Sequence, residues 1–252
     1  MTANFATYPS LKGKTVFITG GASGIGADMV RAFVDQGSKV GFIDMDEATS
    51  AELCASLSGD VAFEKCDLRD IDQLKSAFAK LAEKLGPATV LVNNAARDDR
   101  HGWQDVTPEY WDERQATNLR HHFFAIQAVA PGMIEAGGGS IINMGSNSWW
   151  EAGGDMPAYT TSKAAVHGLT RTMARDLGGH RIRVNTVVPG WIMTDRQKEL
   201  WVTEEAIENH RNRQCLKDLI EPVYVARMVV FLASDDAAMC TANNYMVEAG
   251  SI

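Results

Sequence analysis

The stretch Lys14-Thr15-Val16-Phe17-Ile18-Thr19-Gly20-Gly21-Ala22-Ser23-Gly24-Ile25-Gly26 decides the fold of this chain. A β-branched and aromatic run leads into a glycine-rich turn, and the amphipathic segment 25–34 follows, an order that predicts strand, turn and helix. Glycines at 20, 24 and 26 permit backbone shapes or close approaches that a Cβ would block. The first N–H groups of the helix then favour an anion such as a pyrophosphate. An ordinary tight turn between a strand and a helix is the alternative interpretation.

The rest of the chain repeats this alternation of strand and helix. Further strands are predicted at 39–43, 61–66, 89–93, 140–144, 183–188 and 245–247, and further helices at 46–57, 70–85, 107–136, 159–177 and 221–232. Residues 191–219 are less regular and are expected to form a substrate-side helical insertion. The pattern predicts one α/β domain over residues 1–252, a Rossmann-like, doubly wound parallel sheet with helices on both faces.

Composition narrows the class of protein. The net charge of −8 disfavours nucleic acid or an acidic membrane surface as a partner. No apolar run approaches the ~20 residues of a spanning helix, and Met1 to Lys14 lacks the pattern of a signal peptide. The four cysteines show no C-x-x-C spacing, so we expect no metal site and a reducing, cytoplasmic location.

An acidic residue at the end of the second strand bears on cofactor choice. Asp44 lies about 20 residues past the glycine turn, where an acid accepts hydrogen bonds from ribose hydroxyls and repels a 2′-phosphate. Met45 follows it, and the glycine turn contains no Arg or Lys. We therefore expect NAD rather than NADP; a solvated aspartate at a strand end is the alternative.

The motifs taken in order resemble the short-chain dehydrogenase/reductase family over essentially the whole chain. They are Thr19 to Gly26, Asn93-Asn94-Ala95, Asn118, Ser146, Tyr159 to Lys163, and Pro189-Gly190. Each is weak alone, since Tyr159 and Lys163 could be a surface helical pair and Ser146 a turn cap. Their joint order and spacing are specific.

The resemblance implies that an alcohol gives its proton to the protein while a hydride leaves its carbon for a nicotinamide. A tyrosine with an ordinary pKa of about 10 is a poor base near neutral pH, and a nearby cation lowers that pKa. Tyr159 is therefore the expected general base, and Lys163, one helical turn away, tunes it and holds the nicotinamide ribose. Ser146 is expected to bind the reacting oxygen, with Ser148 as a rival, and Asn118 to hold a water in a proton relay.

Further roles follow from the resemblance alone. The expected cofactor contacts are Gly20, Ser23, Gly24, Ile25, Gly26, Asp44, Asp67, Leu68, Asn94, Ala95, Tyr159, Lys163, Pro189, Ile192 and Thr194. Among them Asp67 is expected to meet the adenine amino group, and Asn94 and Ala95 the adenosine-side ribose. Three departures from the family pattern are visible: Ala96, Ala242 and Ala249 stand where glycine is usual.

The loops favour a sugar as substrate. Residues 94–101, 146–150, the Trp191 region and 214–217 resemble the aldose 1-dehydrogenases of this family, which implies oxidation of D-xylose, L-arabinose or a related hexose to the aldonolactone. Sugars need several hydrogen-bond partners and an aromatic face for their C–H surface. Candidate substrate contacts are Arg97, Asp98, Ser146, Asn147, Trp149, Glu151, Tyr159 and Trp191. Alternatively, the tryptophans pack against a neighbouring subunit and the charged side chains are solvated.

Two other functions remain open from the sequence. One is a reductase or dehydrogenase of the same family for another alcohol or ketone, such as a carrier-bound 3-oxoacyl group or a polyol; Asp44 and the acidic net charge disfavour the carrier-bound substrate. The other is a catalytically inactive binding protein, which the intact catalytic set disfavours. The resemblance also implies a homotetramer with residues 107–130 and 158–177 at one interface.

Overall fold

The computed structural model describes residues 5–251, so the predictions for the N-terminal segment and for both chain ends lie partly outside the described residues. A single sheet runs through the molecule in the order β3-β2-β1-β4-β5-β6-β7, with every pair of neighbours parallel. Its strands are β1 (Thr15–Thr19), β2 (Lys39–Asp44), β3 (Val61–Lys65), β4 (Val90–Asn93), β5 (Gly139–Met144), β6 (Ile182–Pro189) and β7 (Asn244–Val247). The predicted doubly wound parallel sheet is confirmed.

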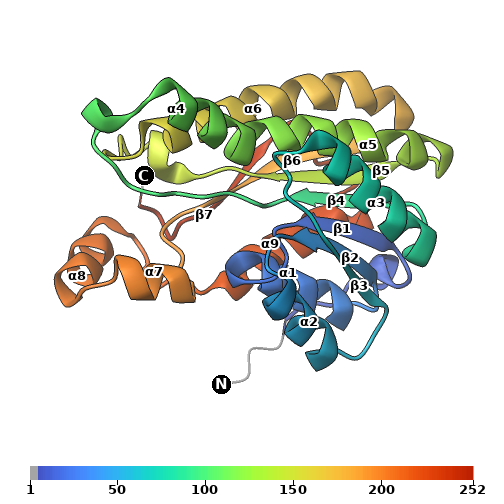
Figure 1. Ribbon diagram of the computed structural model, residues 1–252. Coiled ribbons are helices and arrows are strands. Elements are labelled where there is room, and N and C mark those ends of the chain that lie inside the picture. The colour runs from blue at the N-terminus through green and yellow to red at the C-terminus, as the bar shows by residue number, and fades with distance from the viewer. Residues whose placement is uncertain (1–4, 252) are drawn as a thin grey trace.

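Helices cover both faces of the sheet (Figure 1). One layer contains α1 (Gly24–Asp35), α2 (Glu47–Ser56) and α9 (Pro222–Ala233), and their apolar residues form one buried cluster with the sheet. The opposite layer contains α3 (Ile71–Leu85), α5 (His121–Glu135) and α6 (Pro157–Leu177), which bury a second cluster. Because both faces are covered, β1 and β4 are buried along their whole length, as expected for central parallel strands.

The strand order reverses direction between β1 and β4, since the chain proceeds from β1 to β2 and β3 on one side and from β4 to β7 on the other. In open α/β sheets a crevice forms outside the carboxyl ends of the strands at such a point. The glycine turn after β1 and the segment after β4 are adjacent there: a Cβ added to Gly20 would lie 2.9 Å from the Cα of Ala95. This crevice is where the predicted motifs meet.

The single helix predicted over 107–136 is wrong in its middle. Helix α4 (Pro108–Gln115) begins with a Thr107 cap and is followed by a π-helical turn, Ala116–Arg120, before α5 begins. A π turn accommodates one extra residue and redirects side chains, and such turns are frequent at functional sites. Asn118 lies within it. A residue pattern of period 3.6 contains no signal for this local change of winding.

The segment 191–219 leaves the sheet after β6 and returns to it. It contains α7 (Asp195–Leu200) and α8 (Glu204–Arg213), which extend from one end of the molecule (Figure 1). The N–H of Met193 donates to the carbonyl of Ile220 at 2.9 Å, so the two ends of this excursion are joined. Within residues 5–251, no helix combines the length and the apolar character needed to cross a membrane.

Candidate active site

A cavity of about 1030 Å³ lies at the carboxyl ends of the strands and extends toward α7 and α8. It brings together most of the predicted site residues: Gly20, Ser23, Ile25, Gly26, Asp44, Asp67, Leu68, Asn94, Ala95, Arg97, Asp98, Ser146, Asn147, Glu151, Tyr159, Lys163, Pro189, Trp191, Ile192 and Thr194. Gly24, Asn118 and Trp149 are not among the residues that line it. The volume is large enough for a cofactor and a small substrate together.

Tyr159 and Lys163 lie in the first turns of α6, one turn apart. The Lys163 ammonium is 5.7 Å from the centre of the Tyr159 ring and donates a 2.7 Å hydrogen bond to the carbonyl of Met144 at the end of β5. Ser146 comes two residues after the end of β5, and its hydroxyl contacts the Tyr159 phenol. The Ser146 hydroxyl also accepts a hydrogen bond from the backbone N–H of Ser148. Ser148, the alternative candidate for binding the reacting oxygen, therefore helps to orient Ser146.

The pKa of Tyr159 differs in direction from the sequence expectation. Burial raises the pKa of the phenol, the Asp98 carboxylate raises it further, and contact with Ser146 opposes both. The pKa of Lys163 falls to about 7, because burial disfavours its charged form more than Asp98 favours it. In the chain on its own, desolvation sets the direction of the Tyr159 pKa, and the lowering expected from Lys163 and the oxidised nicotinamide together stays a prediction for the complex with cofactor.

Asn118 is fully buried in the π turn next to the cavity wall. Its side-chain oxygen, Oδ1, accepts a hydrogen bond from the backbone N–H of Arg97 at 2.7 Å, which fixes the loop after β4. Its Nδ2 has no hydrogen-bond partner within residues 5–251. An amide with one end held and one donor free suits the predicted role of binding a polar group, although Asn118 reaches the site from behind the cavity lining.

The end of the cavity near β1 and β2 has the form of a dinucleotide site. Gly24, with φ of +54°, faces Thr194, whose Cγ2 would lie 3.3 Å from a Cβ at that glycine. A Cβ at Gly26 would lie 1.9 Å from the carbonyl oxygen of Gly20, so only glycine lets α1 begin this close to the turn. The N-terminus of α1 is thus exposed to the cavity between two segments, which fits a pyrophosphate.

Asp44 ends β2 at the same place. Its Oδ2 accepts the N–H of Ala22 in the glycine turn at 3.0 Å, and its Oδ1 accepts the N–H of Asp46 at 3.1 Å. The carboxylate is therefore fixed at the cavity edge with its negative charge directed toward the turn. That position suits recognition of ribose hydroxyls and disfavours a phosphate beside it.

Two other predicted cofactor residues have partners within the protein. Arg69 holds the carboxylate of Asp67 through two nitrogens, with Nη2 2.6 Å from Oδ2, and its positive charge and hydrogen bonds keep the pKa of that carboxyl below its ordinary value. The Nδ2 of Asn94 donates to the carbonyls of Thr19 and Gly20, at 3.1 and 2.8 Å. Asn94 therefore holds the glycine turn against the end of β4.

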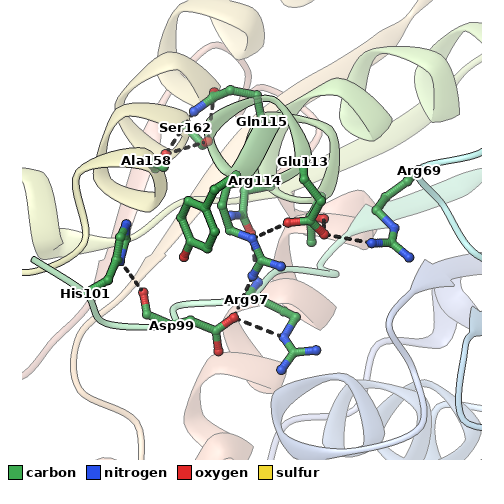
Figure 2. A network of polar contacts seen from close by, with 12 residues as sticks. Arg69, Arg97, Asp99, His101, Glu113, Arg114, Gln115, Ala158 and Ser162 are labelled. Atoms are coloured by element: carbon green, nitrogen blue, oxygen red, sulfur yellow. Dashed lines mark hydrogen bonds and ion pairs between the residues drawn. The ribbon is translucent and has the colours of Figure 1, made fainter. Parts of the chain in front are cut away.

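The Asp67–Arg69 pair belongs to an ion-pair network, of which Figure 2 shows the part from Arg69 to Asp99. Arg69 also pairs with Glu113 of α4, Glu113 contacts Arg114, and Arg114 pairs with Asp99 of the loop after β4 at 2.6 Å. Arg196 of α7 pairs with the same Asp99 at 2.7 Å. The network connects the cofactor end, α4 and the α7 segment, and thereby orders the loop 97–101.

Helix α4 is also attached to the start of α6 (Figure 2). The Gln115 amide donates to the carbonyl of Ala158 at 3.1 Å and accepts from the Ser162 hydroxyl at 3.0 Å. These bonds flank Tyr159 on both sides in sequence. They restrict the helical turn that carries the phenol.

The opposite end of the cavity is polar. Oε1 of Glu151 accepts from Asn147 Nδ2 at 2.8 Å and from the Ser251 hydroxyl at 2.9 Å, which attaches the C-terminal segment to this wall. Arg213 of α8 lies 3.8 Å from Oε2 of the same carboxylate. Asn147 and Glu151 were both expected at the substrate site, and the structure places them together.

Trp149 is not brought to the cavity. Its indole stacks on Trp150 with ring centres 3.8 Å apart, and its Nε1 donates to Nε2 of His167 at 3.1 Å. Trp191, by contrast, lines the cavity, and the ring of His210 packs edge-on against it at 5.1 Å. Of the two tryptophans predicted to contact the substrate, only Trp191 is in position to meet a ligand.

Several cavity residues were missed by sequence reasoning: Arg69, Arg100, Glu113, Arg114, Gln197, Trp201, His210 and Arg213. Arg69 follows Asp67 by two residues, a spacing that could have indicated an ion pair. His210 and Arg213 come from α8, whose sequence has no motif, so no local signal marks them. They belong to the site because the 191–219 excursion folds back over the cavity.

A nucleotide-binding crevice, a buried Tyr–Lys pair and an adjacent serine define an oxidoreductase that uses a nicotinamide cofactor. A family model described as "Enoyl-(Acyl carrier protein) reductase" matches residues 20–251. The chain belongs to the short-chain dehydrogenase/reductase family.

Individual relatives are close in sequence and in fold. D-xylose 1-dehydrogenase of Caulobacter vibrioides is 49% identical over 248 residues, covering 97% of this chain and 98% of the relative. A protein named "Probable galactose dehydrogenase" of Rhizobium meliloti is 43% identical over 254 residues, and the match covers 99% of this chain and 99% of the relative. The crystal structure of a 3-oxoacyl-[acyl-carrier protein] reductase from Brucella melitensis matches with a TM-score of 0.91 and 29% identity, covering 100% of this chain and 98% of that one.

Proposed function

We propose that this protein is an NAD-dependent dehydrogenase that oxidises the anomeric hydroxyl of a pentose or related hexose to the aldonolactone. The observation that carries the proposal is the 49% identity to a D-xylose 1-dehydrogenase across 97% of the chain. The polar substrate end, with Asn147, Glu151 and Trp191, supports a ligand that has several hydroxyls and one apolar face. L-Arabinose, D-xylose, D-galactose and L-fucose are the candidate substrates.

The catalytic residues divide the reaction between them. The Ser146 hydroxyl donates a hydrogen bond to the anomeric oxygen and holds it beside Tyr159. The Tyr159 phenolate takes the O–H proton while the C–H bond gives its electron pair away as hydride and the C=O bond of the lactone forms. When bound, an oxidised nicotinamide would supply the hydride acceptor and a positive charge that favours the phenolate. Lys163 holds the cofactor ribose and contributes a second positive charge when protonated.

NAD is the proposed cofactor because the Asp44 carboxylate lies at the end of β2, bonded to the glycine turn, where it would repel a 2′-phosphate. The proposed ribose, adenine and carboxamide contacts are those expected from the family resemblance, with Asp67 acting in its pair with Arg69. Gly24 contributes through the backbone shape of the turn. Asn118 is proposed to act through its free amide, which is the end directed away from Arg97.

A homotetramer in the cytoplasm is the proposed state of the protein. The four cysteines are all unpaired, which suits a reducing compartment. Phe123 and Ile134, both on α5, are 40% and 39% exposed, and two exposed apolar side chains on one helix support the expectation that it lies at an interface. Light scattering that gives the mass of a monomer at micromolar concentration would contradict the tetramer.

The test is NADH formation from NAD with D-xylose, L-arabinose, D-galactose, L-fucose and D-glucose, with NADP in parallel. Trapping of the product with hydroxylamine identifies a lactone and so locates oxidation at the anomeric carbon. Rapid turnover of one sugar with lactone formation is expected. Turnover of a polyol or of a 3-oxoacyl thioester, with none of any aldose, would replace this function with the alternative considered from the sequence.

A further inference from the structure

Three side chains from separate segments form a hydrogen-bonded chain at the substrate end of the cavity. Nε1 of Trp191 donates to Oε1 of Gln197 at 2.9 Å, and Nε2 of Gln197 donates to Oδ2 of Asp98 at 2.7 Å. Trp191 follows β6, Gln197 is in α7 and Asp98 is in the loop after β4. All three line the cavity.

The donors and acceptors of these three side chains permit only one direction for the hydrogen bonds between them. An indole N–H can only donate and an ionised carboxylate can only accept, so a residue between them must accept at one end and donate at the other. A glutamine amide does both, and its orientation is then determined. Gln197 is itself fixed, because its backbone N–H donates to Oγ1 of Thr194 at 3.3 Å at the start of α7.

Both oxygens of Asp98 have protein partners. Oδ2 accepts from Gln197, and Oδ1 lies 3.7 Å from Nε of Arg196. A carboxylate engaged in this way is better placed to hold the protein than to bind a substrate hydroxyl directly. This differs from the role expected for Asp98 from the sequence, which was contact with the substrate.

We propose that Asp98 and Gln197 are positioning residues that hold the Trp191 indole as the apolar wall of the substrate site, against which one C–H face of a sugar ring lies. The edge-on ring of His210 supports the indole from α8. The bond to Gln197 restrains the indole, because a ring whose N–H is already bonded within the protein has fewer orientations open to it. The identity of the ligand as a sugar rests on the proposed function; the positioning of Trp191 does not.

Exchanging the amide and the carboxylate between positions 197 and 98 tests this set of hydrogen bonds. In Gln197→Glu at pH 8 two carboxylates face each other, so we expect the KM for the sugar to rise about tenfold or more, with NAD affinity within about threefold of the wild type. Adding Asp98→Asn restores the chain, since the new amide donates to Glu and the remaining Glu oxygen accepts from Trp191. The double variant should return the KM to within about threefold of the wild type.

Gln197→Met is the matched control, because it removes both hydrogen bonds without adding a charge. Its KM should also rise, and Asp98→Asn should not rescue it. Each substitution is repeated with Trp191→Phe, which keeps an aromatic ring but has no N–H to hold. In that background the Gln197 substitutions should change the KM by less than about twofold.

A spectroscopic signal from Trp191 itself tests the positioning of the indole independently of whether the substrate is a sugar. The difference in near-ultraviolet circular dichroism between each variant and its Trp191→Phe counterpart isolates this indole among six tryptophans. Gln197→Met should reduce that difference, and the charge exchange should restore it, even if no sugar is a substrate. An unchanged signal in Gln197→Met, or a double variant no better than Gln197→Glu alone, would overturn the proposal.

Discussion

The ammonium of Lys163 donates a 2.7 Å hydrogen bond to the carbonyl of Met144, in a position where the lysine side chain is only 1% exposed. Burial lowers the pKa of this lysine to about 7. The folded protein therefore buries the Lys163 side chain near the candidate base, Tyr159, although burial disfavours the charged form of this lysine.

Lys163→Met is expected to abolish turnover and to stabilise the protein. Below about pH 7 the folded chain must hold a buried charge, so removing the lysine should raise the free energy of unfolding by about 1–4 kcal/mol. The gain is offset in part because the Met144 carbonyl loses its hydrogen-bond donor. In the unfolded chain the lysine pKa is about 10.4, so the gain should be full below about pH 7 and vanish above about pH 10. Urea unfolding at several pH values measures it; a gain that grows with pH would contradict the explanation.

Tyr159→Phe should lower kcat by about 10²–10⁴-fold, because the phenol oxygen is the proposed proton acceptor. The ring and its packing remain, so the dissociation constant for NAD, measured by calorimetry, should change little. Tyr245→Phe, in β7 outside the cavity lining, is the matched control and should retain turnover. Wild-type rates in Tyr159→Phe would remove the phenol from the mechanism.

The rate of sugar oxidation should rise with pH between about pH 6 and pH 9. Burial and Asp98 raise the pKa of Tyr159, so the phenolate that accepts the proton becomes more abundant as the pH increases. The measurement is kcat/KM against pH with NAD saturating. The small residual rate of Tyr159→Phe should lack this dependence, and a wild-type rate that falls over the same range would exclude a phenolate base.

Asp44→Ala should weaken selection for NAD. The carboxylate accepts the Ala22 N–H at 3.0 Å and is the proposed partner of the ribose hydroxyls, so its loss should lower kcat/KM for NAD about tenfold to a hundredfold. The kcat/KM for NADP should rise or hold, because the repulsion of a 2′-phosphate disappears. Asp46→Ala, two residues further along the chain, is the control. An unchanged ratio of the two cofactors would contradict the role of Asp44.

Two departures from the family pattern fall in left-handed backbone. Ala242 and Ala249 have φ of +61° and +60°, a region where glycine has little steric cost and alanine is strained. Ala242→Gly and Ala249→Gly should each stabilise the protein by about 0.5–1 kcal/mol, or about 1–4 °C in Tm.

Ala96→Gly supplies the comparison for these variants, because Ala96 is the third departure and its φ is not positive. It should give no gain in Tm by differential scanning calorimetry. Equal stabilisation by all three substitutions would show that backbone conformation is not the cause.

Sequence reasoning predicted the sheet, its helices and the position of the glycine turn because these depend on local pattern. Seven short apolar strands alternate with helical segments, and the turn around Gly20 needs glycines whatever surrounds it. The pairing of Tyr159 with Lys163 is also local, since a spacing of four residues places both on one helical face. Asp44 follows from its distance along the chain.

The π turn at Asn118, the removal of Trp149 from the cavity and the raised pKa of Tyr159 depend on distant contacts. Trp149 is held by His167 of α6, and the phenol responds to burial and to Asp98, sixty-one positions earlier in the numbering. Such effects depend on desolvation and on which side chains approach from other segments. A pattern of residue types contains no information on either.

The sequence by itself therefore determined the family fold and the candidate catalytic and cofactor-binding residues. Only the tertiary structure decided how the substrate end is built, because that wall is assembled from the loop after β4, the segment after β6, α7, α8 and the C-terminal residues. The bonds from Trp191 to Gln197 and on to Asp98 join positions far apart in the chain. They exist only once the sheet has brought the ends of β4 and β6 to the same edge.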